Sequence, residues 1–145
     1  MNDILTAESG VLRGGAHLLP QRVYYEDTDF SGFVYHASYL RFLERGRTEM
    51  LRALGVHQRE IHAGDAPFVF VVRAMRIEFL KPARMDDVVI VETRAAQIGG
   101  ASMILAQKLM RAGETLVEAE VRVAVVAAGR PVRLPPDIRA RLSQA

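Results

Sequence analysis

The chain has 145 residues, half of them hydrophobic and a quarter charged, a composition typical of one globular domain rather than a disordered segment. It contains no cysteine, which excludes a disulfide framework, a cysteine-ligated zinc site and a thiol nucleophile. The formal net charge is +2 and the basic residues are dispersed, so a small anionic ligand is a better match than a nucleic acid.

Nothing in the sequence indicates export or a membrane span. Residues 1–20 lack an apolar run long enough for a secretion signal, because Asn2, Asp3 and Glu8 interrupt it. No apolar stretch reaches the roughly 18 residues that a membrane span needs. We therefore expect a cytoplasmic protein with no membrane span and no nucleic-acid partner.

In chain order, residues 1–17 are small, polar and glycine-containing, which predicts a flexible N-terminal arm. Residues 18–25 predict a first strand, which an acidic stretch ends. From residue 36 to 54 apolar residues recur every three or four positions, which predicts one long helix that stops at Gly55. Gly46 lies inside this helix at a cost of about 1 kcal/mol relative to alanine, and predicts close approach to another backbone.

The remainder of the chain predicts strands. After a short connection at 56–65, runs rich in Val, Phe and Ile cover residues 68–79, 87–98, 102–110 and 115–126. Gly99-Gly100 predicts a two-residue hairpin turn between the second and third runs. In the last run, apolar residues alternate with charged ones. We expect one domain at residues 18–135 and a tail or short helix at 136–145.

This order of elements predicts an α+β protein, in which one long helix lies across the apolar face of an antiparallel five-stranded sheet. A single helix covers only part of such a sheet. We infer that a second copy of the chain buries the remaining apolar surface and the sheet edge.

The junction between the first strand and the helix concentrates residues suited to chemistry. The first turn of a helix leaves backbone N–H groups unpaired at the positive end of its dipole, where they can hold a developing oxyanion. A carboxylate a few residues upstream can attack the same carbonyl or activate a water. Acyl transfer to water is therefore possible here without a metal, although acidic residues at this position also serve as helix caps.

Two other interpretations are weaker. The spacing of Asp27, Asp29 and Ser31 superficially matches the aspartyl-phosphate phosphatases, but their chemistry needs a parallel α/β sheet that holds Mg²⁺, and the strands here do not alternate with helices. His57 and His62 are five residues apart, do not share a helical face and have no further ligands nearby. We expect no metal and no cofactor.

Two blocks of sequence carry a family resemblance. The first comprises residues 23–29, 34–39 and 47–50 with Gly32, Phe42, Glu44 and Arg45, and the second comprises residues 68–73 and 82–87. They resemble the tol–pal-associated acyl-CoA thioesterases, a branch of the 4-hydroxybenzoyl-CoA thioesterase-like hotdog proteins. The resemblance spans most of the chain beyond residue 17. It implies a hotdog fold, in which the sheet wraps around the long helix.

The resemblance also implies roles for matching positions. Asp29 aligns with the catalytic aspartate, as nucleophile or general base, and the backbone N–H of His36 would polarise the thioester carbonyl. Tyr25 matches a tyrosine associated with the site. Phe30 is bulkier than the residue usual after the aspartate, which reshapes the expected acyl pocket. The expected substrate-binding residues are Gly32, Val34 and Tyr35, with Arg73, Lys81 and Arg84 as cations for the coenzyme A phosphates.

We therefore expect hydrolysis of short- to medium-chain or aromatic acyl-CoA to free acid and coenzyme A, by a homodimer or homotetramer with sites between subunits. Two alternatives stay open. One is an acyl-thioester hydratase or dehydratase on the same fold, and the other is a non-catalytic acyl-binding or envelope-complex module. Acyl carrier protein is an alternative carrier to coenzyme A.

Overall fold

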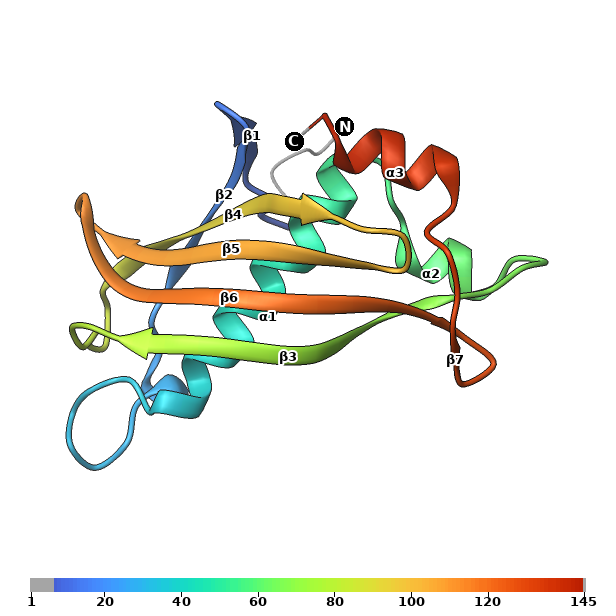
Figure 1. Cartoon of the computed structure of the whole chain (residues 1–145). Coiled ribbons are helices and arrows are strands. Elements are labelled where there is room, and N and C mark those ends of the chain that lie inside the picture. Colours follow the sequence, from blue (N-terminus) through green and yellow to red (C-terminus); the bar gives the residue numbers. More distant parts are fainter. Residues whose placement is uncertain (1–6, 145) are drawn as a thin grey trace.

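The computed structural model describes residues 7–144 and shows an antiparallel sheet with one long helix across a face (Figure 1). The five long strands are β2 (Ala16–Arg22), β3 (Val69–Phe79), β4 (Val88–Ile98), β5 (Ser102–Arg111) and β6 (Glu114–Ala127). Two short strands, β1 (Val11–Arg13) and β7 (Arg130–Pro131), extend the sheet. The helical elements are η2 (Tyr25–Asp27), α1 (His36–Ala53), α2 (Gln58–His62) and α3 (Pro136–Leu142).

The strands lie in the order β1–β2–β4–β5–β6–β3, and β7 pairs with the end of β6. The expected meander is confirmed for β4, β5 and β6, but β3 pairs with β6 at the far edge of the sheet. The edge of β4 that β3 would have taken is paired with β2 instead. The segment 80–87 therefore crosses between two separated strands, and it is longer than the two to five residues usual in a hairpin.

Part of the expected flexible N-terminal arm is regular strand. β1 pairs with the start of β2, and Gly14 and Gly15 join them with φ values of +60° and +78°, the left-handed conformations of a tight hairpin turn. The fully buried His17 side chain lies 2.8 Å from the Ser9 carbonyl oxygen. The prediction of flexibility is therefore wrong for residues 11–17, because the glycines form a turn. Residues 1–6 lie outside the described part of the chain.

Helix α1 matches the predicted range closely and ends before Gly55, whose φ is +82°. Gly46 faces the sheet, where an added Cβ would lie 2.5 Å from Val91 Cγ1 and 3.0 Å from Thr93 Oγ1. The predicted close approach is confirmed, but it is made to side chains of β4 rather than to a backbone. This contact sets how near the helix lies to the sheet.

The strand pattern of β6 is confirmed, since Val117, Val121 and Val125 are buried while the charged residues between them are exposed. The turn between β4 and β5 is longer than predicted. It spans residues 99–101, and the Gly99 N–H donates a 2.7 Å hydrogen bond to the Ser102 carbonyl.

Strand β3 leaves an apolar edge open. Helix α1 packs chiefly against β2 and β4, so it leaves the β3 side of the sheet less covered. Val69, Val71 and Val72 are between 41% and 44% exposed. An unpaired apolar edge of this kind is a template for strand pairing. Within residues 7–144, no helix is both long and apolar enough to cross a membrane.

Candidate active site

The loop between η2 and α1 is closed by hydrogen bonds at its base. Asp27 is buried, and its side-chain carboxylate accepts a 2.8 Å hydrogen bond from the Tyr24 N–H. The backbone carbonyl of Asp27 accepts a second hydrogen bond, of 2.9 Å, from the Tyr35 N–H. Farther out, the Asp29 N–H donates to the Phe33 carbonyl at 3.1 Å. The helix start and Asp29 are thereby held on one small loop.

The Asp29 carboxylate is exposed, and Ser31 holds it. Its Oδ1 accepts hydrogen bonds from the Ser31 hydroxyl at 2.5 Å and from the Ser31 N–H at 2.8 Å. The hydroxyl, then the N–H, lower the pKa of Asp29, and the nearby His36 acts in the same direction. Asp29 is therefore an anion at neutral pH, the form that a base or nucleophile requires.

A cavity of about 360 Å³ opens between this loop, the start of α1 and the end of β3. Its wall contains the side chains predicted to carry chemistry and several apolar ones: Asp29, Ser31, Phe33, Val34, His36, Tyr39, Phe79, Leu80, Lys81 and Pro82. Because α1 begins at His36, the N–H groups of His36 and Ala37 have no intrahelical acceptor, whereas that of Ser38 donates to the Tyr35 carbonyl. The cavity thus combines a carboxylate with the positive end of a helix dipole.

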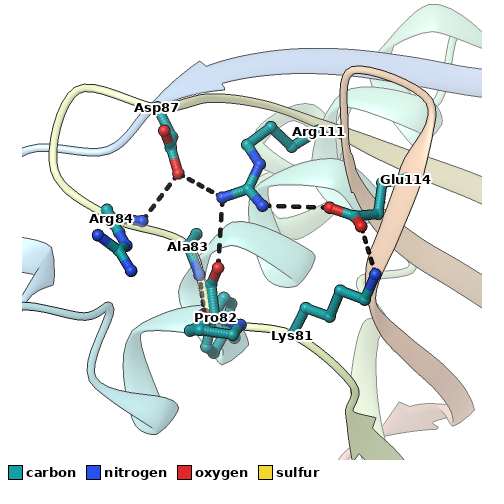
Figure 2. A network of polar contacts seen from close by, with 8 residues as sticks. Lys81, Pro82, Ala83, Arg84, Asp87, Arg111 and Glu114 are labelled. Carbon is teal, nitrogen blue, oxygen red and sulfur yellow. Dashed lines mark hydrogen bonds and ion pairs between the residues drawn. The ribbon is translucent and has the colours of Figure 1, made fainter.

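Figure 2 shows the ion-pair network that supports the segment after β3, which forms one side of the cavity. Arg111 donates hydrogen bonds to Asp87 at 2.8 Å, to Glu114 at 3.1 Å and to the Pro82 carbonyl at 3.3 Å. Glu114 also pairs with Lys81, and these two partners lower the pKa of Glu114. The network ties the segment to the β5–β6 turn.

Ala83 connects this segment to the helix. Its N–H donates a 2.9 Å hydrogen bond to the Tyr39 hydroxyl, and its carbonyl accepts one of 2.9 Å from the Val34 N–H. The side chains of Tyr39 and Val34 are both buried. The wall after β3 and the start of α1 are therefore fixed relative to each other by direct hydrogen bonds.

Four of the predicted site residues line the cavity: Asp29, Val34, His36 and Lys81. The others near it act differently. Gly32 turns the loop with a φ of +88°. The Tyr35 ring lies 4.6 Å from that of His36, and the Arg84 guanidinium lies 5.0 Å from the centre of the Phe33 ring.

Two predicted residues lie away from the cavity within one subunit. Tyr25 begins η2 with its side chain 82% exposed. Arg73 lies at an irregularity in β3, six residues before Phe79, which corresponds to about 20 Å along a strand. Neither residue lines the cavity beside Asp29.

Sequence reasoning missed the roles of Ser31, Tyr39 and Phe79. The spacing of Ser31 two residues after Asp29 is typical of an Asx turn and could have identified that hydrogen bond. Tyr39 lies one helical turn after His36 and therefore on the same face. No local signal marks Phe79, because its place beside His36 depends on the path of β3. Within residues 7–144, no group of three His, Cys, Asp or Glu side chains is arranged to hold a metal ion.

An antiparallel sheet wrapped over one long helix, with a carboxylate beside the start of that helix, defines a protein of the hotdog class. The model of the thioesterase-like superfamily matches residues 23–142, and the chain belongs to this family.

Known proteins agree in sequence and in structure. The chain is 43% identical over 123 residues to the acyl-CoA thioesterase YbgC of Haemophilus influenzae, covering 83% of this chain and 90% of that protein. It is 44% identical over 128 residues to the acyl-CoA thioester hydrolase YbgC of Escherichia coli, covering 86% and 94%. A probable thioesterase from Bartonella henselae superposes with a TM-score of 0.80 at 41% identity, covering 83% of this chain and 99% of that one.

Proposed function

We propose that this protein hydrolyses acyl-CoA thioesters to a free carboxylic acid and coenzyme A. The observation that carries the proposal is that Asp29 and the first residue of α1, His36, line one cavity. Membership of the thioesterase-like family supports the reaction, and the names of the two YbgC relatives support the substrate class.

The reaction follows from this geometry. The carbonyl oxygen of the thioester lies toward the first N–H groups of α1, which stabilise the negative charge that develops on it. Asp29 either removes a proton from a water that adds to the carbonyl carbon, or attacks that carbon itself to form an anhydride that water then hydrolyses. In both cases the C–S bond breaks, and the thiolate of coenzyme A takes up a proton.

Short- to medium-chain or aromatic acyl groups suit this cavity. Its volume of about 360 Å³ lies near the small end of ligand sites, and Val34, Phe79 and Leu80 supply apolar surface. Lys81 lies in the wall of the cavity but is already paired with Glu114. The guanidinium of Arg84 lies over the ring of Phe33, which is also part of that wall. We therefore favour Arg84 over Lys81 as the cation for the coenzyme A phosphates.

A homodimer is part of the proposal. Pairing of the open β3 edge with the same strand of a second copy would bury Val69 and Val71 and continue the sheet. Light scattering of the purified protein measures the molar mass, and a monomer at micromolar concentration would contradict this part.

The direct test is incubation with a panel of straight-chain and aromatic acyl-CoAs, with release of free thiol as the measured quantity. We expect thiol from at least one member of the panel. An enoyl-CoA in the same panel tests the alternative reaction, because a hydroxyacyl-CoA product without thiol indicates a hydratase. Tight ligand binding with no thiol release from any thioester would indicate a binding module and contradict the proposal.

The Ser31→Ala variant should shift the acid limb of the pH–rate profile to higher pH. The Ser31 hydroxyl is the main cause of the lowered Asp29 pKa, so its removal raises that pKa toward its ordinary value. Because the carboxylate is the active form, activity is lost as pH falls through the pKa of Asp29, and the variant loses it earlier. Thiol or thioester assays of kcat/KM against pH measure this shift.

Thr28→Val is the matched control for this variant, since the Thr28 hydroxyl donates to the Tyr25 carbonyl and is not among the causes of the lowered Asp29 pKa. Its acid limb should coincide with that of the unmodified protein. An unchanged limb in Ser31→Ala would show that the group titrating in catalysis is not Asp29.

A further inference from the structure

Arg111, the last residue of β5, joins three acceptors from different parts of the chain (Figure 2). Its Nη1 donates hydrogen bonds to the Asp87 carboxylate at 2.8 Å and to the Pro82 backbone carbonyl at 3.3 Å. Its Nη2 donates to the Glu114 carboxylate at 3.1 Å. Arg111 itself does not line the cavity beside Asp29. Any influence of Arg111 on the reaction must therefore pass through the residues that it holds.

The Pro82 carbonyl is the contact that leads to the site. This carbonyl and the Ala83 N–H belong to one peptide group, which is planar and trans, so the two point in opposite directions. The carbonyl accepts from Arg111, and the N–H donates a 2.9 Å hydrogen bond to the Tyr39 hydroxyl. Ala83 is fully buried. Arg111 and Tyr39 thus hold the two sides of a single peptide group, whose orientation fixes the position of the Tyr39 hydroxyl.

Tyr39 belongs to the part of α1 that the reaction needs. It lies one turn after His36 and lines the same cavity. The Tyr39 ring centre is 5.7 Å from that of Phe79, which in turn lies 6.2 Å from that of His36. A displacement of Tyr39 would therefore move the helix start relative to Asp29. Sites that position reacting groups tolerate errors of only about 0.5 Å.

A contribution to stability alone is the other role open to Arg111. Its side chain is 31% exposed, and exposed ion pairs contribute little to stability. Glu114 also pairs with Lys81. Asp87 also accepts a 2.9 Å hydrogen bond from the Arg84 N–H. Because both carboxylates keep a partner without Arg111, its loss should disturb the orientation of the peptide group more than the fold.

We propose that Arg111 is a positioning residue of the candidate active site, whose guanidinium orients the Pro82–Ala83 peptide group. That peptide group holds Tyr39, and with it the start of α1, beside Asp29. The inference rests on the proposed hydrolysis. A displaced helix start stabilises the developing oxyanion less well, while the cavity still admits the substrate. Removal of Arg111 should therefore lower kcat and leave KM nearly unchanged.

The test is the steady-state release of thiol by Arg111→Ala, with the acyl-CoA found in the panel as substrate. We expect kcat to fall at least about tenfold. Guanidinium chloride at a non-denaturing concentration should restore kcat at least about threefold, because the free cation can take the place of the missing side chain between the two carboxylates and the carbonyl. Potassium chloride at equal ionic strength should restore nothing, since it supplies no donors.

Arg94→Ala is the matched control. Arg94 lies on β4, pairs with Glu92 at 3.5 Å and donates a 3.1 Å hydrogen bond to the Gly14 carbonyl, so it too holds a carboxylate and a backbone carbonyl. None of these three residues lines the cavity. Its kcat should equal that of the unmodified protein, with and without guanidinium.

Arg111→Lys keeps the test decisive if Arg111→Ala does not fold. Lysine retains the positive charge but has one nitrogen in place of the planar fork, so it cannot hold the carbonyl and both carboxylates in the same geometry. We expect a folded variant whose kcat is lower by at least about threefold.

The Ala83 amide signal reports the orientation of the peptide group without any turnover. In NMR spectra of the labelled full chain, this signal should shift in Arg111→Ala and return toward its original position when guanidinium is added. It should stay in place in Arg94→Ala. A role in stability alone predicts neither the shift nor its reversal.

An Arg111→Ala variant that keeps the kcat of an active unmodified protein would overturn the inference. A loss of kcat that guanidinium does not reverse in the folded variant, or one without a shift of the Ala83 signal, would overturn it as well. These results refute only the role of Arg111. Absence of thiol release by the unmodified protein would instead contradict the proposed function itself, so the two failures are distinguishable.

Discussion

Asp29→Asn lowers the turnover of acyl-CoA by about 10²–10⁴-fold, the usual contribution of a positioned proton-transfer group. The amide keeps the shape of the side chain but can neither accept the proton of a water nor attack the carbonyl carbon. The effect falls on kcat, because the loop around Ser31 and the apolar walls of the cavity are unchanged. Steady-state thiol release from the substrate found in the panel measures it.

The fold should survive this substitution, since Asp29 is exposed and lies in a loop. Asp65→Asn is the matched control, because Asp65 is an exposed aspartate remote in sequence from the site and should keep full activity. Thermal unfolding of both variants checks that each is folded. If pure Asp29→Asn kept near wild-type turnover, Asp29 would have to be abandoned as the catalytic residue.

The two roles open to Asp29 can then be separated. Single-turnover incubation in isotopically labelled water with excess enzyme incorporates label into the Asp29 carboxylate if an anhydride forms, because water then attacks either carbonyl of that anhydride. A general base leaves Asp29 unlabelled and places the label in the released acid. Mass spectrometry of the peptide that contains Asp29 distinguishes the two.

Phe42→Ala lowers the free energy of unfolding by about 3–5 kcal/mol, the usual cost of removing a buried phenylalanine. Phe42 is 1% exposed and belongs to the apolar cluster that joins α1 to β2 and β4, with Leu19, Leu43 and Val91 among its members. Its loss leaves a cavity between helix and sheet. Urea unfolding measures the change, with the m-value expected to stay constant.

Leu40→Ala provides the comparison, because Leu40 lies on the same helix but is 40% exposed. Its effect should stay within about 0.5–1 kcal/mol. Similar losses in the two variants would contradict the packing of α1 through its Phe42 face. That packing matters for the site, since α1 carries His36 to the cavity.

The candidate site depends on supports that lie far from it in sequence. Arg111 on β5 holds the Pro82 carbonyl, and Ala83 beside it bonds to Tyr39 on α1. Figure 2 shows how the charged side chains meet around the crossing segment between β3 and β4. The segment after β3 is thereby fixed against the helix start, as a site that positions a reacting carbonyl requires.

Several features could be predicted because they depend on neighbouring residues. The three- to four-residue spacing of apolar side chains predicted α1, and Gly55 predicted its end. Alternation predicted the buried face of β6. The position of Asp29 and His36 around one helix start was also predictable, since they are only seven positions apart and the resemblance to acyl-CoA thioesterases pointed to the same pair.

The sequence by itself therefore determined the α+β class, the long helix and the acidic loop before it, because periodicity and turn chemistry act over a few residues. Only the tertiary structure decided that β3 pairs with β6, that Phe79 and Lys81 complete the cavity, and that Arg47 meets Gln107. Those contacts join residues from about 40 to 60 positions apart, and their formation depends on which strands share an edge. Local sequence patterns do not predict which strands share an edge, because strand order depends on the packing of the whole sheet against α1.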